Sequence, residues 1–404
     1  MDIDLGPEAA RFRQSMREWI AGNAPDGLAT LTDWNVTGMT GGNPVNAEAE
    51  RSPLYAEWER RLRAANLICA WWPEKFGGRG LTPVQHAIFT EELSRAGLPY
   101  VRRGFGEAMV GPSIMAHGTP EQQEYFLPRI ISAEDVYCQG FSEPNHGSDL
   151  AGVQTKAVLD GDELVITGQK VWTSAWYRAN MIFILCRTDP DAPKHRGLSY
   201  VLVPFLDNNI LARPLKQMTG AAEFGEEFFD GARAPLFNVI GGLNNGWRVA
   251  MTTLGFERGG GVSTAYLRYE KQFWDLVELA RKVGRERDPV VRQELAWAYS
   301  HVQIMRFTGL RALARLASGQ EPGPEASTTK LFWSEYERRL GEIAADLLGA
   351  EGMIRPAGDG YPISPWQEVF LASRAGTIYS GTSEIQRNII AERALGLPRA
   401  GSAS

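Results

Sequence analysis

Long apolar runs and cysteines are scarce in this chain of 404 residues. No run approaches the roughly 18–20 apolar residues that span a bilayer, so we expect no membrane insertion. The first residues have neither the basic start nor the apolar core of a secretory signal. Cys69, Cys138 and Cys186 are odd in number and widely spaced, which argues against a disulfide framework. These absences together predict a cytoplasmic location.

The chain also lacks an excess of basic residues and any metal-ligand spacing. Its 42 Lys and Arg against 48 Asp and Glu give a net charge of −6. Proteins that neutralise nucleic-acid phosphates usually lean the other way, so we expect no nucleic-acid partner. There is no CxxC pair, and the five histidines never fall at ligand spacing, so we expect no metal site. These histidines are His86, His117, His146, His195 and His301.

The periodicity of apolar residues divides the chain into three regions. Residues 1–135 and 244–404 show the helical period, whereas residues 136–243 contain short β-branched and aromatic runs between turn signals. Strands at short spacing without intervening helices are typical of an antiparallel barrel or sandwich. Long helical patterns joined by loops are typical of a bundle. The sequence therefore predicts an α+β protein with helical first and last domains.

Local chemistry marks several element boundaries. A capping residue followed by proline predicts helix starts at Ser52, Thr82 and Asp288. Another long helical pattern covers residues 326–348 and stops at Gly349. The predicted strands and turns are Leu164–Thr167, Met181–Leu185, Leu198–Val203 and Phe228–Phe229, a hairpin at Asp160-Gly161, and a loop over Thr32–Asn46.

Three segments combine residue types that suit a cofactor site. Residues 137–149 (YCQGFSEPNHGSD) place hydroxyls and amides in a tight connection after a strand, which suits hydrogen bonding to a planar heterocycle. Residues 168–174 (GQKVWTS) place an indole and a hydroxyl on one face of a strand. Residues 378–387 (IYSGTSEIQR) lead into a helix start, which can accept a pyrophosphate. Each segment also has an interpretation without a cofactor. In the same order, these are a plain turn, a tryptophan of the hydrophobic core and an ordinary capped helix.

The third segment also predicts the end of the fold. Ser383 with Gln386 fits a capping box for a last helix that runs through Ala394. The sequence has no GxSxG elbow, no phosphate-binding P-loop and no GxGxxG after a strand. A nucleotide cofactor would therefore be held by something other than a dinucleotide-binding βαβ unit.

In this order and at these separations, the three segments resemble the acyl-CoA dehydrogenase family. The resemblance covers essentially the whole chain and implies an N-terminal α-helical domain (1–135), a middle antiparallel β-barrel (136–243) and a C-terminal four-helix bundle (244–404). It also implies FAD in a cleft between barrel and bundle. Further stretches that resemble the family are Trp72–Gly78, Gly118–Gln122, Phe224–Pro235 and Gly349–Gly352.

The resemblance implies α,β-dehydrogenation of an acyl-CoA thioester, in which a carboxylate takes the α-proton and the β-hydrogen leaves as hydride to flavin N5. Phe141 and Ser142 resemble the residues that contact the isoalloxazine ring. The other cofactor-binding residues implied are Ser148, Trp172, Ser174, Thr382 and Glu384. An electron-transferring flavoprotein is the implied electron acceptor, and a homodimer or homotetramer is the implied assembly.

The catalytic base is the point at which this sequence departs from the commonest family pattern. Many members carry a glutamate immediately before the Gly-Thr of the third segment, where this chain has Ser380. A minority place the glutamate on the first bundle helix in an L-x-x-E-R context, and residues 254–258 read LGFER. Ala250, Thr253 and Leu254 share a helix face with Glu257, so we predict Glu257 as the base. The alternatives are an ion pair with Arg258 or Arg268, or a solvated helix end.

Two other features leave alternatives open. Gly259–Gly261 follow Arg258 in the sequence. Because glycine is unfavourable inside a helix, three in a row either clear space for a branched or cyclic acyl group or mark a bend or break in the helix. The family's Arg-x-x-Phe-Gly motif is replaced by residues 281–287 (RKVGRER), so Arg281 and Arg285 are either phosphate contacts or solvated cations.

Other functions are alternatives to an active dehydrogenase. Because Ser380 replaces the commonest base, one alternative is a non-catalytic or half-active subunit of a heteromer. A flavin oxidase or monooxygenase on the same scaffold is a further alternative. A DNA-associated member of the family would need a basic patch, and the net charge of −6 gives no sign of one.

Overall fold

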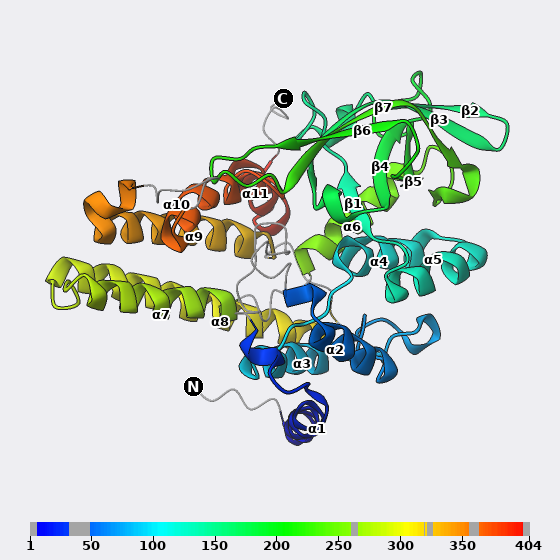
Figure 1. Ribbon diagram of the computed structural model, residues 1–404. Coiled ribbons are helices and arrows are strands. Elements are labelled where there is room, and N and C mark those ends of the chain that lie inside the picture. The colour runs from blue at the N-terminus through cyan, green and yellow to red at the C-terminus, as the bar shows by residue number, and fades with distance from the viewer. Residues whose placement is uncertain are drawn as a thin grey trace. The chain divides into compact units, whose positions relative to one another are not determined.

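The structure is a computed structural model that describes residues 6–31, 49–259, 266–318, 320, 326–354 and 363–398. The chain folds as two compact units (Figure 1). The first unit comprises residues 1–216 and 222–260, and the second comprises residues 217–221 and 261–404. The predicted loop Thr32–Asn46 lies outside the described residues.

Helices form the N-terminal part of the first unit, and their starts are set by local capping. The Ser52 hydroxyl accepts a hydrogen bond from Tyr55 N at 3.1 Å, and Thr82 forms a capping box with Gln85. Each cap precedes a proline at the first helical position, so the predicted starts at Ser52 and Thr82 are confirmed. The helices are α1 (Pro7–Asn23), α2 (Pro53–Ala64), α3 (Pro83–Arg95), the π-helix η5 (Gly106–Val110), α4 (Gly111–His117) and α5 (Pro120–Ser132).

Two buried tryptophans organise the core beneath these helices. Trp58 and Trp72 are fully buried, and their indole N–H groups donate to Pro99 O at 3.0 Å and Glu107 O at 3.2 Å. Gly78 is required beside Trp72, because a Cβ there would lie 2.1 Å from the Trp72 carbonyl oxygen. There is therefore no space for a larger side chain at position 78, within the stretch Trp72–Gly78 that resembles the family.

The middle part of the first unit is an eight-stranded sheet in the order β6-β7-β3-β2-β4-β5-β8, with β1 paired to β4. In the described residues β6 pairs only with β7 and β8 only with β5, so the sheet is not closed and the predicted barrel is not confirmed. The expectation of purely antiparallel pairing is wrong at β4, with which both β1 and β2 pair in the parallel direction. The strands are β1 (Tyr137–Gly140), β2 (Lys156–Asp160), β3 (Glu163–Ser174), β4 (Met181–Arg187), β5 (Leu198–Pro204), β6 (Ile210–Leu215), β7 (Phe224–Pro235) and β8 (Val239–Ile240).

The longest pairing in the sheet joins β3 to β7. The β2–β3 hairpin turns at Gly161, whose φ of +65° suits the predicted Asp-Gly turn. Two register shifts interrupt the β3–β7 ladder, one between Ile166 and Thr167 and the other between Val171 and Thr173. The second shift leaves Trp172 outside the ladder, which is the geometry of a β-bulge.

Helix α6 (Gly246–Gly259) returns the chain from the sheet and belongs to the first unit. It packs against β5, where a Cβ on Gly246 would lie 2.3 Å from the Ser199 carbonyl carbon. Its inner face buries Ala250 and Thr253, and the Thr253 hydroxyl lies 2.7 Å from the Ser113 hydroxyl of α4.

The second unit is helical. Asp288 caps α8 through a 2.9 Å hydrogen bond from Val290 N, which confirms that predicted start. Its buried core is mainly aliphatic and includes the aromatic residues Tyr269, Phe273 and Tyr336. The His301 ring stacks on Phe332 with centroids 5.0 Å apart. Helix α9 ends at Leu348 before Gly349, as predicted. The elements are α7 (Tyr266–Lys282), α8 (Pro289–Ala317), α9 (Ala326–Leu348), the 3-10 helix η9 (Gly349–Met353), α10 (Pro365–Gly376), α11 (Ser383–Ile389) and the π-helix η10 (Ile390–Ala394).

Candidate active site

The loop after β1 carries Phe141 and Ser142 and is tied to β3. The Phe141 ring is only 5% exposed and packs edge-on against Phe183 and Tyr200. Because this ring lies in the core, the part of Phe141 left for a ligand is its main chain. The Ser142 carbonyl accepts a 2.9 Å hydrogen bond from Val171 N, which joins the first predicted segment directly to the second.

A buried ion pair supports this loop. The Lys170 ammonium donates to Glu143 Oε1 at 2.9 Å, to Phe141 O at 3.1 Å and to Leu185 O at 2.7 Å. Glu143 also accepts main-chain hydrogen bonds from Gln154 N at 2.7 Å and Thr155 N at 2.8 Å. Lys170 therefore links the loop after β1 to β3 and β4. Sequence analysis did not single out either residue.

Burial and pairing act in opposite directions on this ion pair. Burial raises the pKa of Glu143, but Lys170 and the two main-chain N–H donors outweigh it and the pKa ends below its ordinary value. Burial lowers the pKa of Lys170, and Glu143 partly offsets that effect. Because all three groups around Lys170 Nζ are hydrogen-bond acceptors, the charged ammonium is the form that the site satisfies.

The end of β3 presents the second segment. Trp172 is 59% exposed and has a φ of +63°, a conformation in which a bulky residue is rare. Its ring packs edge-on against Phe224, with centroids 6.0 Å apart. Thr173 is fully buried, whereas Ser174 is half-buried. The sequence alternative of a core tryptophan is therefore wrong, because the bulge turns this indole toward solvent.

A buried carboxyl lies behind this strand end. Glu227 of β7 is fully buried, and its Oε2 accepts a hydrogen bond from the Thr173 hydroxyl. Burial raises the pKa of Glu227 to about 8. Sequence analysis missed this residue, since only the register with β3 shows which of Glu226 and Glu227 faces inward.

Ser148 lies on the exposed rim of the first segment. The turn before it is closed by two 3.0 Å main-chain hydrogen bonds between Glu143 and His146. Asp149, which follows Ser148, pairs with Lys194 at 2.6 Å. The structure thus holds the chain on both sides of Ser148 and leaves Ser148 itself exposed.

The predicted base lies in the last turn of α6. The backbone of Glu257 is helical, and its side chain lies outside what the structure describes. Of its predicted helix face, Ala250 and Thr253 are buried and Leu254 is half-buried. Arg268, one of the alternative ion-pair partners, forms an ion pair with Glu337. The role of Glu257 remains a prediction.

The third segment forms a tight turn into α11 in the second unit. Thr382 is the N-cap, with a 3.2 Å hydrogen bond from Ile385 N, so the predicted capping box led by Ser383 is wrong. The Gln386 amide instead donates to Ser380 O at 2.9 Å. Gly381 has a φ of +85°, and a Cβ there would lie 2.6 Å from the Gln386 amide nitrogen. Helix α11 passes into the π-helix η10, which reaches Ala394 as predicted.

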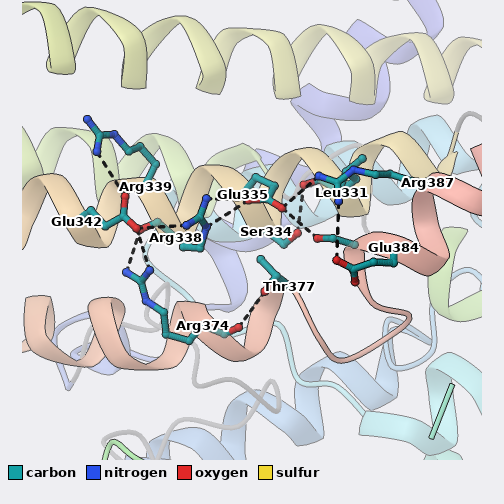
Figure 2. Close-up of polar contacts among 11 residues, drawn as sticks. Leu331, Ser334, Glu335, Arg338, Arg339, Glu342, Arg374, Thr377, Glu384 and Arg387 are labelled. Carbon is teal, nitrogen blue, oxygen red and sulfur yellow. Dashed lines mark hydrogen bonds and ion pairs between the residues drawn. The ribbon is translucent and has the colours of Figure 1, made fainter.

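Helix α9 anchors this turn through a set of ion pairs (Figure 2). The Ser383 hydroxyl donates to Glu335 at 3.0 Å, and Arg387 lies 3.8 Å from the same carboxylate oxygen. Figure 2 shows Glu384 beside Arg387, at 4.0 Å. Hydrogen bonds from its own N–H and from Thr382 lower the pKa of Glu384. Helix α10 is joined to the same face of the set by an ion pair between its Arg374 and Glu342 of α9 at 2.9 Å.

The arginines considered as phosphate contacts carry local acidic partners. Arg281 pairs with Glu278, and Arg285 pairs with Asp288 at 3.0 Å and Asp346 at 3.3 Å. Their pairing favours the interpretation as ordinary surface cations. The described residues contain no group of metal-binding side chains and no helix long and apolar enough to cross a membrane.

Comparison with known proteins identifies the class. Family models for the acyl-CoA dehydrogenase N-terminal, middle and C-terminal domains match residues 42–134, 138–231 and 244–395 in that order. The chain therefore belongs to the acyl-CoA dehydrogenase family and has its fold, with a helical N-terminal part, a middle sheet and a helical C-terminal part. It is an oxidoreductase of a flavin-dependent class, and its substrate class is the acyl-CoA thioester.

Individual relatives match over the full length. Acyl-CoA dehydrogenase IpdE1 of Mycobacterium tuberculosis is 44% identical over 393 residues, which is 97% of this chain and 98% of that protein. The solved structure of the Tcur3481-Tcur3483 steroid ACAD is 30% identical with a TM-score of 0.79 over 99% of this chain and 100% of that chain. The ChsE4-ChsE5 complex from Mycobacterium tuberculosis is 28% identical with a TM-score of 0.76 over 99% and 100%.

Proposed function

We propose that this protein is an FAD-dependent acyl-CoA dehydrogenase that introduces an α,β double bond into an acyl-CoA thioester, with Glu257 as the base. The observation that carries the proposal is the strand end in the first unit. There the loop residue Ser142 is hydrogen-bonded to β3, and β3 turns the Trp172 indole outward at a bulge. The family membership supplies the chemistry, and this strand end supplies a surface that suits a planar ring.

The residues present fit a flavin. An outward-facing indole, two half-buried serines and a loop carbonyl held by an ammonium combine an aromatic face with hydrogen-bonding groups, as a flat polar heterocycle requires. We assign ring contacts to Phe141 (through its main chain), Ser142, Trp172 and Ser174. Ser148, Thr382 and Glu384 are proposed as further FAD contacts. When bound, FAD accepts the two electrons and the hydrogen that leave the β-carbon.

The remaining chemistry is a proton transfer by the protein. The α-proton of a thioester is weakly acidic, so a carboxylate must lie close to the α-carbon and away from bulk water. We assign this task to Glu257 because Ser380, at the position of the commonest family base, has no group that can accept such a proton. The buried face of α6 at Ala250 and Thr253 fixes the helix that carries Glu257.

The acyl group is proposed to contain fused rings. One full-length structural relative is titled a steroid ACAD. Two residues after Glu257, Gly259–Gly261 provide three consecutive positions without a side chain, which suits a wide acyl group. We also propose an electron-transferring flavoprotein as electron acceptor. The assembly predicted from the sequence is a homodimer or homotetramer, and the ChsE4-ChsE5 relative, which is a complex of two named proteins, keeps a heteromer among the candidates. The cytoplasmic location stays a prediction.

The test is reduction of the bound flavin by substrate. The purified chain is loaded with FAD and mixed anaerobically with straight-chain, branched and steroid-derived acyl-CoA thioesters, and flavin bleaching is followed by absorbance. Bleaching with a polycyclic acyl-CoA supports the full proposal, and bleaching only with straight chains contradicts the proposed acyl group. Bleaching that appears only after a related subunit is added supports the heteromer. Rapid reoxidation of the reduced flavin by oxygen supports the oxidase alternative.

A further inference from the structure

Glu227 is a buried carboxyl on β7. Its side chain is 0% exposed, and among the described residues no lysine or arginine forms an ion pair with it. Its Oε2 accepts the Thr173 hydroxyl, and its Oε1 has no hydrogen-bond partner in the described part of the chain. A Cβ on Gly225 would lie 2.2 Å from Glu227 Oε1, so this oxygen is closely packed. A carboxylate is costly in such a place, whereas a neutral carboxylic acid is tolerated.

The titratable groups on the neighbouring strands do not neutralise Glu227. Lys170, its partner across the β3–β7 ladder, already uses its ammonium on Glu143 and two carbonyl oxygens. The negative charge of Glu226 raises the pKa of Glu227 further. The Glu226 carboxylate itself accepts a hydrogen bond from the Gln169 amide. Cys138 of β1 is a buried thiol whose own pKa is raised by burial. Burial and Glu226 raise the pKa of Glu227 and together outweigh the Thr173 hydrogen bond, which lowers it.

The contact with Thr173 lies at the bulge. The register shift falls between Val171 and Thr173, so Trp172 is the residue expelled from the ladder and carries the left-handed φ. A bulge leaves its extra residue without ladder hydrogen bonds, and a bulky residue with positive φ persists only where the surroundings hold it. The Thr173–Glu227 hydrogen bond is the side-chain link that fastens the bulge to β7 immediately after Trp172.

We propose that Glu227, as a neutral acid bonded to Thr173, is a positioning residue that fixes the bulge and thereby presents Trp172 and Ser174 to the flavin. This inference rests on the proposed function, because it takes the strand end to be the flavin surface. Ionisation of Glu227 would place an unpaired charge beneath the strand and loosen the bulge. Flavin binding should then weaken with increasing pH in a way that depends on this one carboxyl group.

The experiment measures the FAD dissociation constant of the full-length chain from pH 6 to pH 9 by flavin fluorescence. Glu227→Gln keeps a neutral acceptor of the same shape, and Thr173→Val removes the hydroxyl at nearly constant volume. Thr173→Ser restores the hydroxyl, and Thr155→Val is the matched control, since the buried Thr155 hydroxyl makes only a 3.4 Å hydrogen bond to Gln169 O. The visible absorbance of the bound flavin is recorded for each variant as a second readout.

The expected results separate positioning from mere folding. Parent FAD affinity should fall about tenfold one pH unit above the pKa of Glu227, whereas Glu227→Gln should bind as tightly as the parent at pH 7 with no such loss at pH 9. Thr173→Val should bind about tenfold more weakly and shift the flavin spectrum, while Thr173→Ser and Thr155→Val should match the parent.

Three results would overturn the inference. They are equal affinity of Thr173→Val and the parent, loss of FAD by Glu227→Gln at pH 7, and a pH-dependent loss in Glu227→Gln identical to the parent's. If Glu227→Gln does not fold, the Thr173 pair decides the question by itself. A parent chain that binds no FAD at all would instead contradict the proposed function.

Discussion

Replacing Lys170 by methionine tests the buried ion pair that supports the Phe141–Ser142 loop. The variant leaves Glu143 in a dry environment with only its two main-chain donors, at 2.7 and 2.8 Å. It also removes the ammonium donor from the carbonyls of Phe141 and Leu185. Breaking a buried pair by removing one partner costs about 3–5 kcal/mol. We therefore expect a loss of about 4 kcal/mol in the free energy of unfolding.

The assay is urea unfolding followed by tryptophan fluorescence, with a thermal scan as a second measure. For a folding unit of this size, a loss of about 4 kcal/mol corresponds to a decrease in Tm of about 8–16 °C. The double variant Lys170→Met/Glu143→Gln should recover at least about 1 kcal/mol of the free energy of unfolding, because it no longer buries a carboxylate without its cation. The control is Arg233→Met, which loses only exposed ion pairs with Asp160 and Glu163 and should leave the Tm close to that of the parent. A Lys170→Met variant as stable as the Arg233 control would refute the reasoning.

Three other predictions concern stability. Gly246→Ala should lower the free energy of unfolding by more than about 2 kcal/mol in urea titrations, because its Cβ would lie 2.3 Å from the Ser199 carbonyl carbon and α6 must shift; an unchanged midpoint would refute this. Thr382→Ala should cost about 1 kcal/mol through loss of the α11 cap, and Thr382→Ser should restore it. Burial raises the pKa of Glu227 from 4.5 to about 8 in the folded chain, so folding retains a proton that unfolding releases. The unfolding free energy should therefore fall as pH rises from 5 to 8, by up to about 1.4 kcal/mol per pH unit, relative to Glu227→Gln.

Features governed by neighbours in sequence could be predicted from the sequence. Ser52, Thr82 and Asp288 each cap a helix that begins with proline, because the cap and the missing N–H are matters of adjacent residues. The Asp160-Gly161 hairpin follows from the same kind of local chemistry. The choice between Thr382 and Ser383 as N-cap failed, since two adjacent hydroxyls give the same local signal.

Features governed by distant pairing could not be predicted from the sequence. The parallel pairing of β1 with β4 joins strands about forty residues apart, and no local pattern encodes it. The bulge at Trp172 depends on how β3 registers against β7, so alternation along β3 alone could not show that the indole faces outward. Lys170 and Glu227 look like ordinary surface charges in sequence, and only the fold reveals that both are buried.

The central claim is that Glu257 removes the α-proton, and the most direct measurement is anaerobic reduction of bound flavin by acyl-CoA in the Glu257→Gln variant. We predict that this variant folds and binds FAD like the parent, while its rate of flavin reduction falls by about 10²–10⁴-fold, the usual contribution of a general base. Flavin reduction at the parent rate, with FAD fully bound, would contradict the account.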